Sequence, residues 1–305
     1  MKVKFWGVRG SIPCPGADTV KYGGNTPCIE LRLDDGSLVI LDSGSGIRAL
    51  GNAMMERDLK KGPIQADIFL THTHWDHILG FPFFSPIYLK GTRLNIYGPV
   101  THENETLEEI VGGQLAYRYF PVRHTELMST ISYISVKEGP VPLRRKDLKV
   151  FTTYLNHPVL CFGYRIEYGG KVLCTAYDTE PFCNVFCEDP NDPSYDASMA
   201  REGREAAKDA NDRLERFLEG ADLLVTDAQY TRSDYHAGKK GWGHSAMEDA
   251  IALGRRARVK QLALFHFDPA YSDDMLDRCA HDLFPTGSLD NMGVFFAREG
   301  MEITL

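Results

Sequence analysis

Thr71-His72-Thr73-His74-Trp75-Asp76-His77 places three imidazoles and one carboxylate within six consecutive residues, 72–77. The stretch follows the apolar run at 66–70, which predicts a buried strand. Because side chains alternate along a strand, His72 and His74 are expected on one side, while Asp76 and His77 turn away from the strand end. Four donors this close together suit two neighbouring metal ions better than one, although a solvated histidine-rich loop is the alternative.

The pattern from His72 to His77 resembles the His-x-His-x-Asp-His signature of the metallo-β-lactamase fold hydrolases. Further residues match the family's remaining ligand positions in chain order, each after a predicted strand or hairpin: His157, Asp178 and His266. The resemblance implies two metal ions bridged by Asp178. It assigns three further ligands to each ion: His72, His74 and His157 to the first, and Asp76, His77 and His266 to the second. Zn²⁺ is the expected metal, with Mn²⁺ or Fe²⁺ as alternatives for such ligands.

Predicted strands and helices alternate in two halves of the chain, which indicates an α/β (α+β) fold. The pattern predicts two mixed β-sheets packed face to face with helices outside, and the family's fold is this αββα sandwich with the metals at one edge. We expect a single domain over 1–305 with an insertion at about 181–220. An acidic, proline-broken loop at 181–203 precedes an amphipathic helix predicted at Arg204–Leu218. His102 and His124 lack ligand partners nearby in the sequence and are expected at the surface.

Composition is that of an ordinary soluble globular protein, with 43% apolar and 25% charged residues among 305. The formal net charge of -8 disfavours a broad basic surface for nucleic acid. A small anionic substrate remains compatible with it, because bound divalent ions invert the local charge. Seven scattered cysteines suggest reduced thiols. Neither a signal peptide nor a run of ~18 apolar residues is found, so we expect a cytoplasmic protein that does not span a membrane.

A second cluster follows the predicted strand at 223–226. Gly243-His244-Ser245 precedes a predicted helix, and Ser245 with Glu248 forms the pattern of a capping box. His244 would then lie immediately before a helix N-terminus, which suits a phosphate. This element resembles the phosphodiesterase branch of the fold, where the extra histidine assists at the leaving group or the developing charge. By that resemblance, His244 and Asp76 are expected in catalysis, and Asp227 is expected to orient His244.

Several polar and aromatic residues near the predicted site are expected to contact substrate, although turns, core packing or solvated lysines are equally simple explanations. They are Asn25, Trp75, Lys239 and Lys240. Asp42, in a turn that resembles the family's Asp-x-Gly-x-Gly pattern, is expected either to orient a ligand histidine or to form an Asx turn.

The expected function is hydrolysis of a small phosphodiester, with a 3′,5′-cyclic nucleotide as first choice. Hydroxide held between the two ions would attack phosphorus while His244 assists. Alternatives are an acyl or lactone hydrolase, a phosphodiesterase for a cyclic sugar phosphate or an RNA 3′ end, and a non-catalytic binding protein. A large nucleic acid is disfavoured because the chain is acidic and lacks an evident Gly/Pro-rich arm, and a homodimer is a further expectation.

Overall fold

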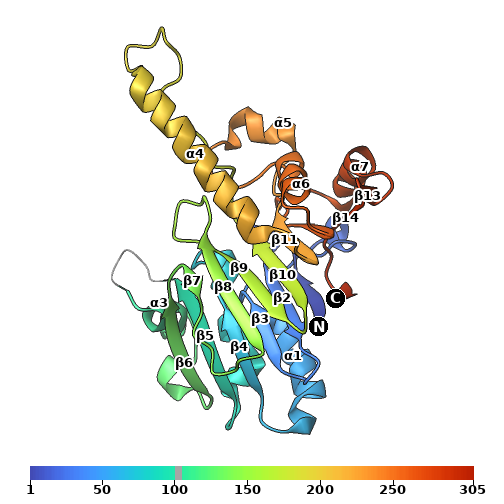
Figure 1. The fold of residues 1–305 in the computed structure, drawn as a ribbon. Helices are drawn as coiled ribbons and strands as arrows, with labels where there is room; N and C mark the ends of the chain where they lie inside the picture. Colours follow the sequence, from blue (N-terminus) through green and yellow to red (C-terminus); the bar gives the residue numbers. More distant parts are fainter. Residues whose placement is uncertain (100–104) are drawn as a thin grey trace.

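The computed structural model describes residues 1–99 and 105–305 and has the predicted architecture of two mixed sheets flanked by helices (Figure 1). His102 lies outside the described residues. The first sheet has seven strands, in spatial order: β15 (Glu302–Thr304), β1 (Lys2–Gly7), β2 (Cys28–Arg32), β3 (Leu38–Leu41), β4 (Gln65–Phe69), β5 (Arg93–Pro99) and β6 (Thr130–Val136).

The second sheet has eight strands, in spatial order: β13 (Ser288–Leu289), β14 (Met292–Phe296), β12 (Gln261–Phe265), β11 (Leu223–Asp227), β10 (Lys171–Ala176), β9 (Phe162–Tyr168), β8 (Leu148–Tyr154) and β7 (Gly139–Pro140). The α-helices are α1 (Ile47–Arg57), α2 (Trp75–Ile78), α3 (Leu107–Gly113), α4 (Ala197–Leu218), α5 (Arg232–Asp234), α6 (Met247–Arg256) and α7 (Asp273–Leu283). Short 3₁₀ turns lie at 17–19, 59–61, 81–83, 85–88 and 124–126, and a π-helical turn spans Tyr235–Lys239. His124 is partly buried, and its Nε2 lies 2.8 Å from the Tyr133 hydroxyl.

Aromatic rings fill the space between the sheets. Phe69 of β4 and Tyr164 of β9 meet edge to face at 5.5 Å, and Tyr97 of β5 stacks on Phe69 at 4.7 Å. The Tyr164 hydroxyl donates to the Leu70 carbonyl at 2.6 Å, immediately before the histidine-rich stretch. Each large ring removed from water stabilises the fold by about 1.5–3 kcal/mol. The packing of the second sheet therefore fixes where that stretch begins.

Strand direction brings the predicted site residues together. Strands β10, β11 and β12 are parallel neighbours, so their C-terminal ends lie at one edge of the second sheet. Asp178, Asp227 and His266 are at or just beyond these ends. The histidine-rich stretch leaves the C-terminal end of β4 in the facing sheet. One edge of the sandwich therefore collects polar side chains from both sheets.

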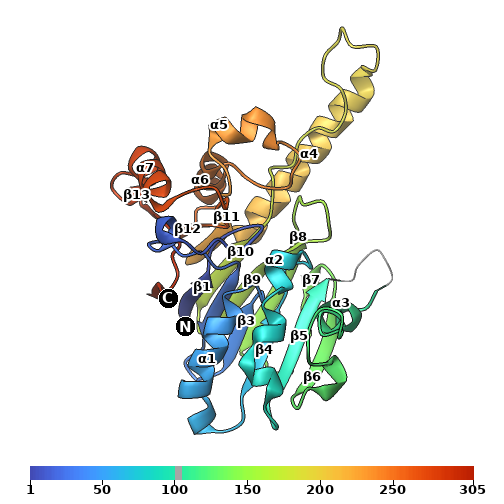
Figure 2. The same ribbon diagram turned by 180° about the vertical axis from the view of Figure 1, so that it is seen from behind.

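Helix α4 projects away from the two sheets (Figures 1 and 2). It begins at Ala197 rather than at Arg204, because the Asp196 carboxylate accepts from the amides of Ser198 and Met199 and caps the helix. In its C-terminal part, Leu214 and Leu218 are buried in the hydrophobic core. This end of the predicted apolar stripe therefore packs against the rest of the protein. All seven cysteines are free. Within the described residues, no helix is both long and apolar enough to cross a membrane.

Candidate metal centre

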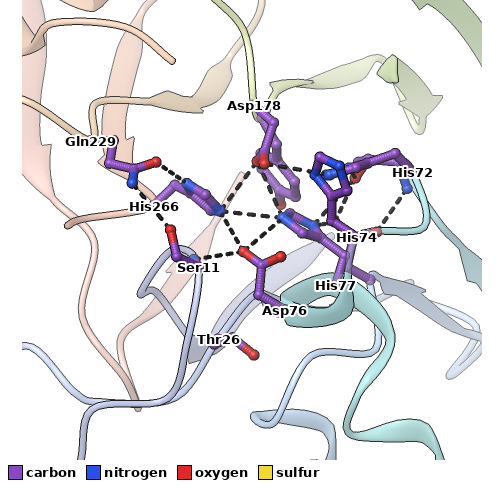
Figure 3. Close-up of polar contacts among 12 residues, drawn as sticks. Ser11, Thr26, His72, His74, Asp76, His77, Asp178, Gln229 and His266 are labelled. Carbon is purple, nitrogen blue, oxygen red and sulfur yellow. Dashed lines mark hydrogen bonds and ion pairs between the residues drawn. The ribbon is translucent and has the colours of Figure 1, made fainter. Parts of the chain in front are cut away.

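Seven side chains predicted as ligands converge at this edge in two overlapping groups. Within each group, one ligand atom from every residue lies within 4.8 Å of the others. The first group is His72, His74, His157 and Asp178, and the second is Asp76, His77, Asp178 and His266. Asp178 belongs to both groups and lies between the other side chains (Figure 3). These two groups contain the residues of the two ligand sets implied by the sequence, and a third group, Asp178, Asp227, His244 and His266, overlaps them.

Donor atoms approach one another in pairs that do not form ordinary hydrogen bonds. His74 Nδ1 lies 3.1 Å from His157 Nε2, and His77 Nε2 lies 3.2 Å from His266 Nε2. Donors bound at about 2.0–2.1 Å to one tetrahedral ion lie about 3.3 Å apart. His72 Nε2 and Asp178 Oδ1 are buried and make no hydrogen bond. Asp178 Oδ1 also lies 3.2 Å from His77 Nε2 and 3.3 Å from His266 Nε2. These spacings fit two divalent ions.

Three neighbours orient the second group of ligands. The Asp42 carboxylate accepts from His77 Nδ1 at 2.8 Å, and it also accepts from the amide and hydroxyl of Thr71. Asp42 therefore holds a ligand histidine, the first of the two roles expected for it. The Ser11 amide donates to Asp76 Oδ2 at 2.7 Å, while His266 Nδ1 lies 3.2 Å from the Gln229 amide oxygen (Figure 3).

The first group is oriented by backbone as well as by side chains. His157 Nδ1 donates to the Gly243 carbonyl at 3.0 Å. Gly243 has φ +81, and a Cβ there would lie 2.5 Å from His157 Nδ1, so only glycine fits this approach. His72 Nδ1 lies 3.1 Å from the Thr71 hydroxyl. His72, Asp178 and the side chain of His157 are buried, whereas His74 is more exposed, so the centre opens to solvent beside His74.

Electrostatics separates the two groups. Burial lowers the pKa of His157 to about 4 and the pKa of His72 well below its usual value, so both imidazoles are neutral donors near pH 7. Burial would also lower the pKa of His77, but the carboxylates of Asp178, Asp76 and Asp42 outweigh it and raise that pKa well above the usual value. Three carboxylates around one imidazole demand positive charge, which a divalent cation supplies.

The backbone is strained at three residues of the centre. Asp42, Asp178 and His266 have φ values of 59, 35 and 64, in the left-handed region that non-glycine residues rarely adopt. Such conformations cost of order 1–3 kcal/mol each and persist where the surroundings determine them. Here Asp42 and His266 directly follow the ends of β3 and β12, and Asp178 is the second residue after the end of β10.

His244 and Asp227 form a pair beside the second group. His244 Nδ1 donates to Asp227 Oδ2 at 2.6 Å, and the His244 ring stacks on the His266 ring with centroids 5.2 Å apart. Burial alone would lower the pKa of His244, but the Asp227 carboxylate outweighs it and raises the pKa to about 9. Asp227 also accepts from the amides of Gln229 and Ser245. The Asp227 oxygens therefore fix the backbone at Gln229 and Ser245 as well as the His244 side chain.

The predicted capping box at Ser245 and Glu248 is wrong. Helix α6 begins after Ala246, which makes no side-chain cap. The Ser245 hydroxyl instead donates to the Thr179 carbonyl at 2.5 Å, because the packed second sheet brings that carbonyl within reach. His244 is therefore held by Asp227 and does not lie immediately before the helix N-terminus.

The four expected substrate contacts have different surroundings. Asn25 is bonded through its side chain to Glu299 and Ser45, which leaves it a structural role in the loop. Trp75 is 81% exposed between His74 and Asp76. Lys239 lies against the Trp242 ring, with its ammonium 4.1 Å from the ring centroid, and Lys240 is exposed.

Three residues of the centre were not anticipated from sequence: Ser11, Gln229 and Glu180. Gln229 links His266 to the Ser11 hydroxyl at 3.2 Å. Glu180 is buried and binds the loop before His244. The available signal was weak: Glu180 lies two residues after a predicted ligand and Gln229 two residues after Asp227.

Comparison with known proteins agrees with this geometry. Residues 22–149 match the model of the Metallo-beta-lactamase superfamily. Ribonuclease Z of Enterococcus faecalis is 25% identical over 335 residues, covering 98% of this chain and 99% of that protein. Ribonuclease Z of Streptococcus suis is 28% identical, covering 89% and 90%. These names stand against the expectation that a large nucleic acid is disfavoured.

Solved structures share the fold over the full length of the chain. The metallo-beta-lactamase fold protein YhfI from Bacillus subtilis has a TM-score of 0.62 at 20% identity, covering 99% of both chains. The short form of human tRNase Z also has a TM-score of 0.62 at 20% identity, covering 100% of this chain and 99% of that one. At this identity the similarity establishes the αββα fold.

Proposed function

This chain carries a metallo-β-lactamase superfamily domain, and we propose that it is a dinuclear metal-dependent phosphodiesterase. The proposed substrate is a phosphodiester whose leaving group is a ribose oxygen, with a 3′,5′-cyclic nucleotide as first candidate. Two bound divalent ions would supply an activated hydroxide and stabilise charge on the phosphoryl oxygens. His72, His74 and His157 would hold one ion, Asp76, His77 and His266 the other, and Asp178 both.

The observation that carries this proposal is the His244–Asp227 pair. In the proposed assignment, His244 is a proton donor outside the two ligand sets, and the centroid of its ring lies 5.2 Å from that of His266. A ribose alkoxide is a poor leaving group, so protonation during cleavage accelerates the reaction by roughly 10²–10⁴-fold. The Asp227 carboxylate raises the pKa of His244, which favours the protonated imidazole. Because it accepts from Nδ1, the Nε2 of His244 is left to face away from Asp227.

An RNA 3′ end is the second candidate substrate, because relatives that match this chain along most of its length are named ribonuclease Z. The leaving group would again be a ribose oxygen, so the same proton donor would serve. The net charge of -8 argues for a substrate with few phosphate contacts.

A substrate panel tests the proposal. The protein is loaded with Zn²⁺ or Mn²⁺ and assayed with a cyclic nucleotide, a transfer-RNA precursor with a 3′ trailer, and a lactone. Hydrolysis of either phosphodiester with dependence on His244 supports it. Hydrolysis of the lactone alone would assign the centre to acyl chemistry. If His244→Ala cleaves both phosphodiesters as fast as the wild type does, the main argument for the proposal is lost.

A further inference from the structure

The loop at residues 235–243, which we call the rim loop, is fixed to the metal centre by a buried carboxylate. Glu180 is 4% exposed and accepts from the Tyr235 hydroxyl, from the Gly241 amide at 2.9 Å and from the Gly243 amide at 3.2 Å. The backbone on both sides of Trp242 is therefore held by one side chain. Glu180 lies two residues after Asp178, which belongs to both ion groups. The segment that holds the rim loop is therefore the segment that carries this shared ligand.

Trp242 is rigidly presented and yet largely exposed. Its neighbour Gly243 contacts His157 through its carbonyl, and His244 is the next residue. The Trp242 side chain is nevertheless 55% exposed. A tryptophan stabilises a fold mainly when its ring is buried. The exposed Trp242 ring contributes little in this way, so stability of the fold does not explain its position.

Lys239 places a positive charge against the rings of Trp242 and Tyr230. Its ammonium lies 4.1 Å from the Trp242 ring centroid and 5.5 Å from that of Tyr230. The Tyr230 ring in turn lies 6.1 Å from the His244 ring. Among the described residues, no carboxylate forms an ion pair with Lys239. The rim loop thus offers a flat ring and an unpaired cation on the side of the centre where His244 lies.

We propose that Trp242 and Lys239 form a subsite for the nucleoside that carries the leaving oxygen. The inference rests on the proposed function, in which His244 protonates that oxygen and the nucleoside that carries the oxygen lies on the His244 side of the centre. The base stacks on the exposed indole, and the Lys239 ammonium attracts the phosphodiester. Glu180 is a positioning residue that holds both side chains in place. Stacking of a base on an aromatic side chain contributes about 1–3 kcal/mol.

The test compares two substrates that share their reacting atoms, namely 3′,5′-cyclic AMP and the base-free ribose 3′,5′-cyclic phosphate. In the metal-loaded protein, Trp242→Ala should raise KM for cyclic AMP about tenfold, the equivalent of 1.4 kcal/mol, without a matching fall in kcat. KM for the base-free substrate should not change, and Trp242→Phe should retain most of the binding. Lys239→Ala should raise KM for both substrates, whereas Lys146→Ala, a surface lysine outside the loop, should change neither.

An equal change in KM for both substrates in Trp242→Ala, or no change in either, would overturn the inference. If the wild-type protein cleaves neither substrate, the cyclic nucleotide is ruled out as its substrate, and the subsite is judged by calorimetric binding of 5′-AMP to the metal-loaded protein. Binding about tenfold weaker in Trp242→Ala would then support the subsite, and equal binding would refute it. Metal analysis of each variant confirms that the centre is intact.

Discussion

Replacement of Asp227 by asparagine should change the pH dependence of the reaction. Burial lowers the pKa of His244, but the carboxylates of Asp227 first, and then of Asp178 and Asp76, raise it from 6.5 to about 9. Asparagine keeps the shape of the side chain but removes the charge, so the pKa of buried His244 should fall to 6.5 or below. A raised pKa means that the protonated form is present at low pH and is lost as pH rises through about 9.

The expected loss is therefore larger at alkaline pH. At pH 8, about nine-tenths of His244 is protonated in the wild type and about 3% in Asp227→Asn, so cyclic nucleotide hydrolysis should fall about 30-fold. At pH 6 the loss should be less than about twofold. The assay is kcat/KM against pH, with a p-nitrophenyl phosphodiester as control because its leaving group departs unprotonated. Equal losses at both pH values, or equal losses for both substrates, would refute this role.

Three further variants test the centre. His244→Ala should keep both ions and reduce cyclic nucleotide cleavage by roughly 10² or more while p-nitrophenyl diesters lose much less; equal losses would assign His244 to charge stabilisation. Asp178→Ala should lose metal, measured by elemental analysis, together with activity, and full activity with one ion would contradict the shared-ligand assignment. Glu180→Gln should speed hydrogen exchange at the Gly241 amide by roughly tenfold, since a bond to a charged acceptor is weakened, and unchanged exchange would show that the loop is held otherwise.

The ligands were predictable because each follows a strand that can be recognised from the pattern of apolar residues in the sequence. His72 continues the apolar run of β4, and Asp178 follows a hairpin with two glycines at its turn. A buried strand has a direction and an end, so a polar residue at that end has a definite place in the sandwich. The family resemblance then supplied the order in which His157 and His266 join them.

Residues that act through distant partners were not predictable. The Ser245 hydroxyl had a local partner in the expected capping box, yet it bonds to Thr179, 66 residues away. The Asn25 amide appeared free for substrate but is bonded to Glu299. Glu180 gave no periodic or motif signal, since its bonds are to backbone amides of the rim loop. Short polar side chains have several possible partners of similar energy, and only the packed fold selects among them.

The division of ligands between the sheets has a consequence for folding. Each ion group takes two donors from residues 72–77 and its remaining donors from residue 157 onward. Metal binding therefore also stabilises the docking of the N-terminal half of the sandwich on the C-terminal half. Chelation should therefore weaken the docking of the two halves, which would stay joined by rings such as Phe69 against Tyr164 and Phe5 against Phe265 and by the pairing of β15 with β1. Metal supply in the cell would thereby decide how long the finished protein survives proteolysis, as well as whether it is active.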